Sequence, residues 1–135
     1  MGETLAWNMR SSSDPPLKCA DITDQILGAF YKVYNRLGPG LAERIYQRAL
    51  VDELRRRGCD VSAQQGLSMR YGQTKLGRFR ADLLVEGRVL VEIKARSRIL
   101  KSHWAQLLHY LAVTGNEVEL LLNFGPKPQF KRLVS

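Results

Sequence analysis

The chain is poor in cysteine and contains no long hydrophobic run. Its two cysteines, Cys19 and Cys59, form no CxxC pair and no cluster with histidine, so the ligand spacing of a structural zinc site is missing. So little cysteine is typical of a reduced intracellular compartment, and we expect a cytoplasmic protein. The N-terminal segment carries Glu3, and no apolar stretch approaches the length that spans a bilayer. We therefore expect neither secretion nor a membrane partner.

Acidic residues are also in short supply. Thirteen Asp and Glu stand against 21 Lys and Arg, which gives a formal net charge of +8, and 14 of the cations are arginine. Such an excess favours a polyanionic partner, and the guanidinium group binds phosphate through two parallel hydrogen bonds. We therefore expect a nucleic acid as partner, with a basic surface that serves only solubility as the alternative.

Low-complexity segments and internal repeats are absent, and the composition is that of an ordinary globular chain. Hydrophobic residues make up 44% and charged residues 25% of the 135 residues. These values indicate one domain with its own core and exclude a disordered or multidomain protein. Residues 1–18 include a Ser-Ser-Ser-Asp-Pro-Pro run, so we expect a flexible N-terminal arm followed by a single domain at 19–135.

Hydrophobic spacing predicts an α/β fold. The expected helices cover about 21–36, the segment from Leu41 to Gly58, and about 102–114. The expected strands cover 61–71, 76–84, 88–95 and 118–124, with a short edge strand at 130–134. This order, α-α-β-β-β-α-β, predicts a mixed sheet of four to five strands flanked by helices.

Three charged residues lie on one expected hairpin. We expect its loop to be residues 85–87, which pairs Asp82 with Leu90. Because cross-strand partners project to one side of a sheet, Asp82 then shares a face with Glu92 and Lys94. The other face carries only apolar residues and is expected to pack against helices; these are Phe79, Ala81, Leu83, Val85, Val89, Val91 and Ile93.

Two carboxylates and an ammonium on a partly covered sheet face point to metal chemistry. Neighbouring carboxylates repel each other unless a cation lies between them, and hard oxygen ligands suit Mg²⁺ or Mn²⁺. Such an ion polarises a phosphate oxygen and lowers the pKa of a bound water, and a nearby ammonium stabilises the developing charge. The alternative for Glu92 and Lys94 is an ordinary surface ion pair.

The same residues resemble a known motif. Asp82, followed on the next strand by Glu92-Ile93-Lys94, resembles the signature of the PD-(D/E)XK nuclease superfamily, although Ala81 stands where the motif has proline. The resemblance implies a restriction-endonuclease-like α/β sandwich. It also implies that Asp82, Glu92 and the backbone carbonyl of Ile93 bind the metal, and that Lys94 is the catalytic lysine.

A second segment resembles one family within that superfamily. Gly40, Glu43 and Tyr46 have the spacing of the GxxExxY signature. The resemblance implies that Glu43 is an additional helix-borne acid at the metal, that Gln106 is the glutamine that closes the site, and that Gly40 and Tyr46 support it. Taken alone, Glu43 could serve only the dipole of its helix, and Tyr46 could be an ordinary core residue.

Cations near the expected carboxylates form a candidate path for a phosphate backbone. The residues expected to contact nucleic acid are Arg80, Arg96, Arg98, Lys101 and His103. Tyr110 is expected to face the carboxylates from the last helix in a supporting role. The alternative is a solvated loop with no ligand.

The sequence therefore predicts a Mg²⁺- or Mn²⁺-dependent nuclease that hydrolyses phosphodiester bonds by a metal-activated water, with DNA as the favoured substrate and RNA as the alternative. The 135 residues contain no separate recognition helix, which leaves a homodimer open. The alternative is a catalytically silent nuclease-fold module that binds nucleic acid or a protein, because fold alone does not settle function.

Overall fold

The computed structural model describes residues 20–134, except for six side chains of helix α4. The helices are α2 (Ala20–Leu37), α3 (Glu43–Arg56) and α4 (Lys101–Thr114). The strands are β1 (Val61–Tyr71), β2 (Thr74–Val85), β3 (Val89–Lys94), β4 (Val118–Phe124) and β5 (Pro128–Val134). The expected order of elements is confirmed, and the edge strand begins two residues earlier than expected. The arm expected at 1–18 and Cys19 lie outside the described residues.

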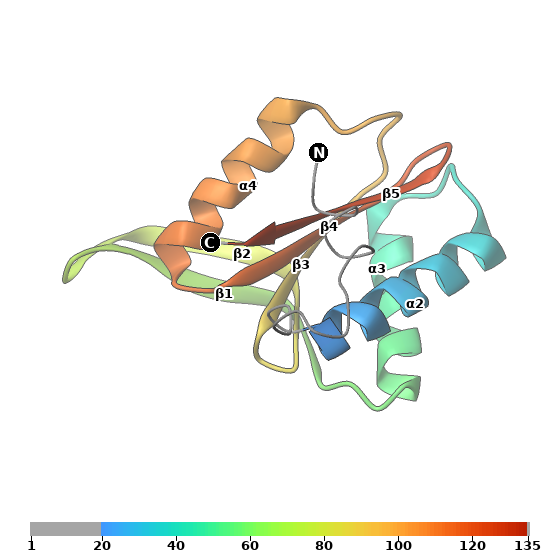
Figure 1. Ribbon diagram of the computed structural model, residues 1–135, viewed down its shortest axis with the longest axis horizontal. Helices are drawn as coiled ribbons and strands as arrows, with labels where there is room; N and C mark the ends of the chain where they lie inside the picture. Colours follow the sequence, from blue (N-terminus) through green and yellow to red (C-terminus); the bar gives the residue numbers. More distant parts are fainter. Residues whose placement is uncertain (1–19, 135) are drawn as a thin grey trace, which may run out of the picture.

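The five strands form one mixed sheet in the order β1-β2-β3-β4-β5 (Figure 1). Strands β3 and β4 are parallel, and all other neighbours are antiparallel. Helix α4 joins the two parallel strands, which need a long crossover connection. The α/β class and the mixed sheet predicted from the sequence are therefore confirmed. Within residues 20–134, no helix is both long and apolar enough to cross a membrane.

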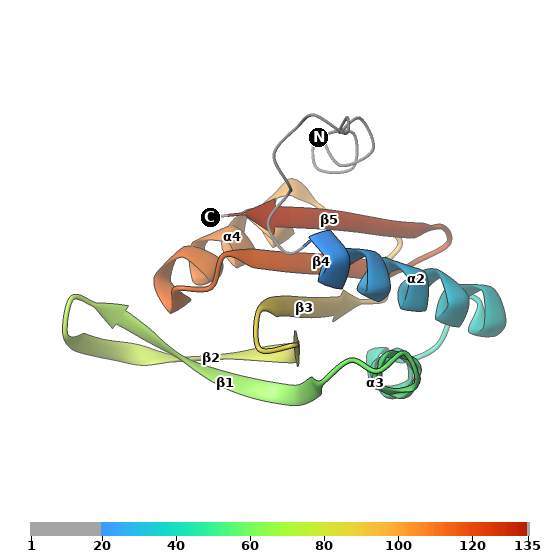
Figure 2. The same ribbon diagram turned by 60° about the horizontal axis from the view of Figure 1, so that its bottom comes forward.

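Helices cover both faces of the sheet (Figure 2). On one face, Phe30 of α2 and Leu50 of α3 pack with Val91 in one buried cluster. On the other face, Leu107 of α4 packs with Leu90 in a second cluster. Each large apolar side chain that is fully buried contributes about 1.5–3 kcal/mol. The two clusters hold the helices against the central strands and so fix the position of α3 relative to β3.

Strand β2 changes its packing partners at Asp82. Leu83 packs under α2 and α3, whereas Phe79 and Ala81 pack in the α4 cluster. The expectation of a single apolar face is therefore wrong for Phe79 and Ala81. The β1–β2 ladder keeps one register from Val61 to Met69, but within it Gln64 and Asp82 form no pair, and Gln64 has a φ of 54°. Strict alternation of faces holds only along a continuous ladder.

The register between β2 and β3 also differs from expectation. Leu84 pairs with Leu90, and the loop consists of residues 86–88 instead of 85–87. The next position along the two strands therefore brings Asp82 opposite Glu92 instead of Leu90. A shift of two residues preserves the parity of the faces, and it brings the two carboxylates closer than expected.

Candidate active site

The site begins where the β2–β3 ladder ends. Beyond the Leu83–Val91 pair, two carboxylates replace the backbone as hydrogen-bond acceptors between the strands. The backbone N–H of Ile93 donates to Asp82 Oδ2 at 2.7 Å, and the backbone N–H of Asp82 donates to Glu92 Oε2 at 3.1 Å. These reciprocal hydrogen bonds orient both carboxylates into the space where the strands separate.

The two carboxylates lie in a poorly solvated environment. Asp82 is half-buried and Glu92 is only 6% exposed. Burial raises the pKa of Asp82, against the opposing effects of the Ile93 N–H and the Lys94 charge. Burial, followed by the charge of Asp82, raises the pKa of Glu92 to about 8. At neutral pH the pair therefore does not carry two full charges unless a cation compensates them.

The donor set fits a hard divalent cation. Each carboxylate accepts one backbone N–H and keeps lone pairs for a further ligand. The N–H and C=O of a strand residue point to the same neighbouring strand, so the Ile93 carbonyl is directed to the same side as its N–H, toward Asp82. Among residues 20–134, no group of three Asp, Glu, His or Cys side chains is placed to hold one ion. Asp82, Glu92 and the Ile93 carbonyl, three members of the expected set, remain compatible with this geometry. Glu43, the fourth expected member, is not grouped with the two carboxylates in this way, and its place at the metal stays a prediction.

Glu43 and Lys94 lie at the same end of the sheet. Glu43 is the first residue of α3, and its Oε2 accepts the backbone N–H of Ala95 at 3.3 Å. The charge of Glu43 raises the pKa of both Asp82 and Glu92, and the charge of Lys94 lowers both. The structure thus brings together the four charged residues that the sequence singled out. Their roles as ligands or catalysts stay predictions.

The Gly-x-x-Glu-x-x-Tyr spacing has a local structural explanation. Gly40 has a φ of 103°, a conformation that favours glycine, in the turn that leads into α3. Tyr46, fully buried one turn into α3, donates its hydroxyl to the Gly38 carbonyl at 2.5 Å and accepts the Leu41 N–H at 3.1 Å. Its ring stacks on Phe124 at a centroid distance of 4.2 Å. Tyr46 is thus a core residue that also fixes the turn before Glu43.

Removal of this hydroxyl gives a first testable prediction. We expect Tyr46→Phe to lower the free energy of unfolding by about 0.5–1.5 kcal/mol, because two part-buried backbone groups lose their hydrogen-bond partner, and to reduce activity by loosening Glu43. Urea denaturation measures the first effect. Tyr34→Phe is the matched control, since the Tyr34 hydroxyl also contacts two backbone carbonyls, those of Gly125 and Pro126, but makes no hydrogen bond to the turn before α3. Equal losses of activity in both variants would contradict the role of Tyr46.

The cations expected to contact nucleic acid are exposed wherever the structure describes them. Arg80 precedes Asp82 on β2, and the segment from β3 to the start of α4 carries Arg96, Arg98 and Lys101. Their contacts with a phosphate backbone stay predictions. The side chains of His103, Gln106 and Tyr110 lie outside the described residues, so their expected roles also stay predictions.

Two polar residues at the site were not identified from the sequence. Gln64, in the strained backbone position opposite Asp82, donates to Gln47 Oε1 at 3.2 Å and hydrogen-bonds the Asp82 carboxylate. It thereby joins β1, α3 and the site. Asn123 is fully buried, and its amide accepts the Arg96 N–H at 2.9 Å and donates to the Arg96 carbonyl at 3.0 Å. The Asn-Phe-Gly run that ends β4 was the available signal for Asn123, whereas no sequence pattern indicated Gln64.

A buried acid, Glu119, lies beside the site in the sheet. It pairs with Leu90 of β3 and Leu133 of β5, and its side chain is fully buried. Among the side chains that the structure describes, neither of its carboxylate oxygens finds a hydrogen-bond partner. Burial, followed by the charges of Glu92 and Asp82, raises the pKa of Glu119 to about 9. Glu119 is therefore protonated at neutral pH.

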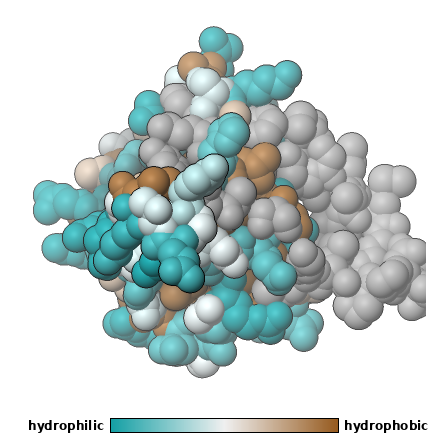
Figure 3. Space-filling model, turned by 90° about the vertical axis from the view of Figure 1, so that its left-hand side faces the viewer, coloured by the Kyte–Doolittle hydropathy of each residue, from teal (hydrophilic) through white to brown (hydrophobic). Residues whose placement is uncertain are grey.

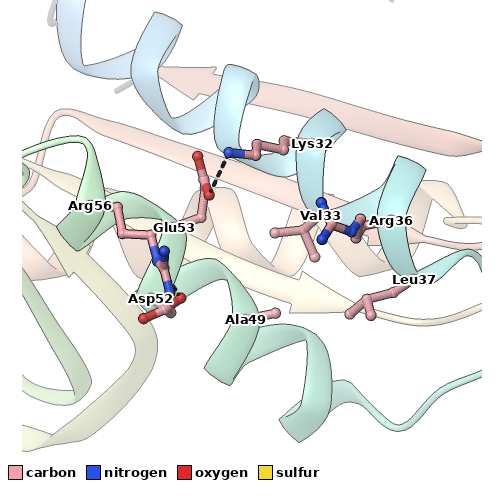
Figure 4. A pocket seen from close by; sticks show the side chains of 8 residues that line it. All are labelled: Lys32, Val33, Arg36, Leu37, Ala49, Asp52, Glu53 and Arg56. Carbon is pink, nitrogen blue, oxygen red and sulfur yellow. Dashed lines mark hydrogen bonds and ion pairs between the residues drawn. The ribbon is translucent and has the colours of Figure 1, made fainter.

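A separate pocket of about 260 Å³ lies between α2 and α3 (Figure 4). Lys32 of α2 reaches across it to Glu53 of α3 at 3.3 Å, and Asp52 pairs with Arg56 on α3 at 2.8 Å. The acids that line the pocket are thus already paired with cations. None of the residues predicted for catalysis lines it, so this pocket is not the active site.

Comparison with known proteins identifies the class. The sequence matches the PD-(D/E)XK nuclease superfamily over residues 20–133. The chain therefore belongs to the PD-(D/E)XK nuclease superfamily, as the motif on β2 and β3 indicates.

A solved structure shares the fold. The crystal structure of SSO0001 superposes with a TM-score of 0.52 at 20% sequence identity, covering 69% of this chain. The chain spans about half the length of that protein, since 50% of SSO0001 is covered. This likeness supports the restriction-endonuclease-like architecture alone. No curated protein matches the sequence.

Proposed function

We propose that this chain is a metal-dependent nuclease that hydrolyses phosphodiester bonds in DNA, and that it belongs to the GxxExxY family. The observation that carries the proposal is the pair formed by Asp82 and Glu92 beside Lys94. Burial raises the pKa of both carboxylates, so the arrangement is costly without a cation and suited to one with it. The net charge of +8 favours a polyanionic substrate.

Asp82, Glu92 and the Ile93 carbonyl would hold the ion, with Glu43 as an additional acid at its edge. Oxygen donors of this kind favour Mg²⁺ or Mn²⁺. When bound, such an ion polarises a phosphate oxygen and lowers the pKa of a water molecule.

The chain's own residues supply orientation and charge. The hydrogen bonds between β2 and β3 hold the two carboxylates in place before the substrate arrives. Lys94, half-buried at the end of β3, places an ammonium next to the carboxylates, where it stabilises negative charge that develops on the scissile phosphate. The hydrogen bond from the Ala95 N–H to Glu43 keeps the start of α3 against this end of the sheet.

Substitution of the lysine tests this assignment. We expect Lys94→Ala to lower the cleavage rate by about 10²–10³, because a preorganised charge at the reacting phosphate is lost. The measurement is cleavage of labelled single-stranded, duplex and branched DNA and RNA in Mn²⁺, Mg²⁺ or EDTA. Lys127→Ala, which removes an exposed lysine from the β4–β5 turn, is the matched control.

The outcomes separate the proposal from its alternative. Metal-dependent cleavage that persists in Lys127→Ala and is lost in Lys94→Ala supports the nuclease and identifies the preferred substrate. Equal activity in all preparations, or activity in EDTA, indicates a contaminant and contradicts it. Binding of nucleic acid without any cleavage favours the catalytically silent module.

A further inference from the structure

The β1–β2 hairpin projects beyond the rest of the sheet (Figure 1). Strands β1 and β2 have 11 and 12 residues, whereas β3 has 6 and pairs with β2 only from Leu83 to Val85. The outer part of the hairpin is therefore a two-stranded ribbon. Its Leu67 and Phe79 pack toward α4, so one face of the ribbon is covered and the other is open.

The part of the hairpin that lies beyond the active-site residue Asp82 is basic and carries no acid. Between residues 61 and 81 there is no Asp or Glu. The four cations of this stretch are all exposed; they are Arg70, Lys75, Arg78 and Arg80. Within residues 20–134, no ion pair or hydrogen bond engages the side chains of these four cations. Their charges are thus available to an external anion, unlike those of Arg56 or Arg57, which pair with acids of their own helix.

Small partners leave room for the arginines on the open face. Arg80 pairs with Gly66 and Arg78 pairs with Ser68. The Arg78 guanidinium occupies the space that a Cβ on residue 66 would need. Glycine at this position therefore lets Arg78 lie across β1, where its guanidinium spreads over the surface of the ribbon.

Large apolar side chains are exposed at the tip. Tyr71 is 78% and Leu76 is 60% exposed. Seen toward this end of the molecule, the surface combines a broad hydrophilic area with smaller hydrophobic patches (Figure 3). Aromatic and apolar tips beside cations are typical of elements that enter a nucleic-acid groove.

We propose that the open face of this hairpin binds duplex DNA and extends the substrate contact away from the active site. This inference rests on the proposed function. Arg70, Lys75, Arg78 and Arg80 contact phosphates, and the tip residue Tyr71 approaches a groove. Charge complementarity supports this partner, and a major groove is wide enough to admit a two-stranded ribbon.

The geometry of β2 connects the hairpin to the site. Lys75 and Asp82 lie on one strand, seven residues apart, which corresponds to about 23 Å at the rise of an extended strand. At 3.4 Å per base pair, this length matches about seven base pairs of duplex. A domain without a separate recognition helix thereby gains contacts well outside the reacting phosphodiester.

The test is the salt dependence of duplex binding. A labelled duplex of about 20 base pairs, long enough for the span above, is titrated in EDTA, so that binding is measured without cleavage. The hairpin variant Lys75→Ala/Arg78→Ala is compared with Arg36→Ala/Lys127→Ala, which removes the same charge from the end of α2 and the β4–β5 turn. We expect the hairpin variant to bind about tenfold more weakly, with a salt slope shallower by about two. The control is expected to keep the wild-type slope.

Several outcomes would overturn the inference. A hairpin variant with wild-type affinity and slope contradicts it, and so does an equal loss in the control, since net charge alone would then explain binding. If the hairpin variant keeps its affinity for duplex DNA and loses affinity only for single-stranded RNA, the proposed duplex partner is wrong. Because all replaced residues are exposed, thermal melting is expected to be unchanged, and Arg78→Lys is expected to retain part of the affinity.

Failure of the hairpin and failure of the nuclease are distinguishable. If the wild type cleaves no substrate while the hairpin variant loses duplex binding, the nuclease proposal fails and the hairpin stands. If the wild type cleaves duplex DNA and the hairpin variant binds and cleaves equally well, the hairpin proposal fails and the nuclease stands.

Discussion

Replacement of Asp82 by asparagine is expected to lower metal-dependent cleavage by about a thousandfold or more, because several kcal/mol of charge stabilisation at the phosphate are lost with the ion. The amide oxygen of asparagine can still accept the Ile93 N–H, which Asp82 Oδ2 accepts at 2.7 Å. The fold is therefore preserved, and only the charge and one donor atom change.

Stability and activity are expected to diverge in this variant. Burial raises the pKa of Asp82, and the charge of Asp82 raises the pKa of Glu92, so the carboxylate pair costs stability without an ion. Asp82→Asn should therefore melt at the same temperature as wild type or higher while cleavage is lost. Asp60→Asn, which changes an exposed acid, is the control and should keep full activity. Full cleavage by Asp82→Asn would refute the assignment of this residue.

The second large effect is expected at Glu119 and concerns pH. The pKa of Glu119 is raised from 4.5 to about 9 in the folded protein, so above pH 4.5 the folded state holds a proton that the unfolded state has released. This stabilising contribution is fully present below pH 4.5 and is lost progressively as the pH rises to about 9. Stability of the wild type should thus fall across this window.

Glu119→Gln should remove the share of this pH dependence that comes from Glu119, whereas Glu92, whose pKa is also raised, keeps its own share in the variant. The amide imitates the protonated acid in shape and charge, so melting temperatures should coincide below pH 4.5, the pKa of an unperturbed Glu. At pH 8 the variant should melt about 5 °C or more above wild type. The measurement is a melting series from pH 4 to 9, with Glu117→Gln as an exposed neighbour for comparison. Parallel curves for Glu119→Gln and wild type would contradict the raised pKa.

That Asp82 and Glu92 share one face of the sheet could be predicted, because side chains alternate between the faces and a pairing error of an even number of residues does not change the face. The expected loop was displaced by one residue and the pairing by two, yet an even shift keeps both carboxylates on the same face. The tight approach of their oxygens to backbone N–H groups could not be predicted, because it depends on the point at which the strands separate. That point is set by packing of the whole sheet.

The packing of Ala81 and the role of Gln64 could not be predicted. Alternation along β2 places Ala81 with Leu83, but the positive φ of Gln64 interrupts the neighbouring ladder opposite Asp82. Glutamine has no particular preference for that conformation, so no local signal marks it. Glu119 posed a similar difficulty, since a buried acid that has no partner among the described side chains contradicts the usual rule for strand interiors.

The turn before α3 shows what a motif adds to periodicity. Helical spacing predicts a helix in this region, and the structure places its start at Glu43. Only the joint presence of Gly40 and Tyr46 indicates that Glu43 is held in a defined position, because Tyr46 bonds the turn on both sides of Gly40. The physical content of the motif is thus a fixed approach of α3 to the end of β3.

Direct titration of Mn²⁺ into the protein tests most plainly the claim that Asp82 and Glu92 form a divalent cation site. Calorimetry at pH 7 in two buffers of different ionisation enthalpy reports both affinity and proton release. The account predicts binding to wild type with release of protons, because the pKa of Glu92 is about 8 before the ion binds. It predicts binding to Asp82→Asn that is weaker by about 100-fold or more. Equal affinity in both proteins, with no proton release, would contradict it.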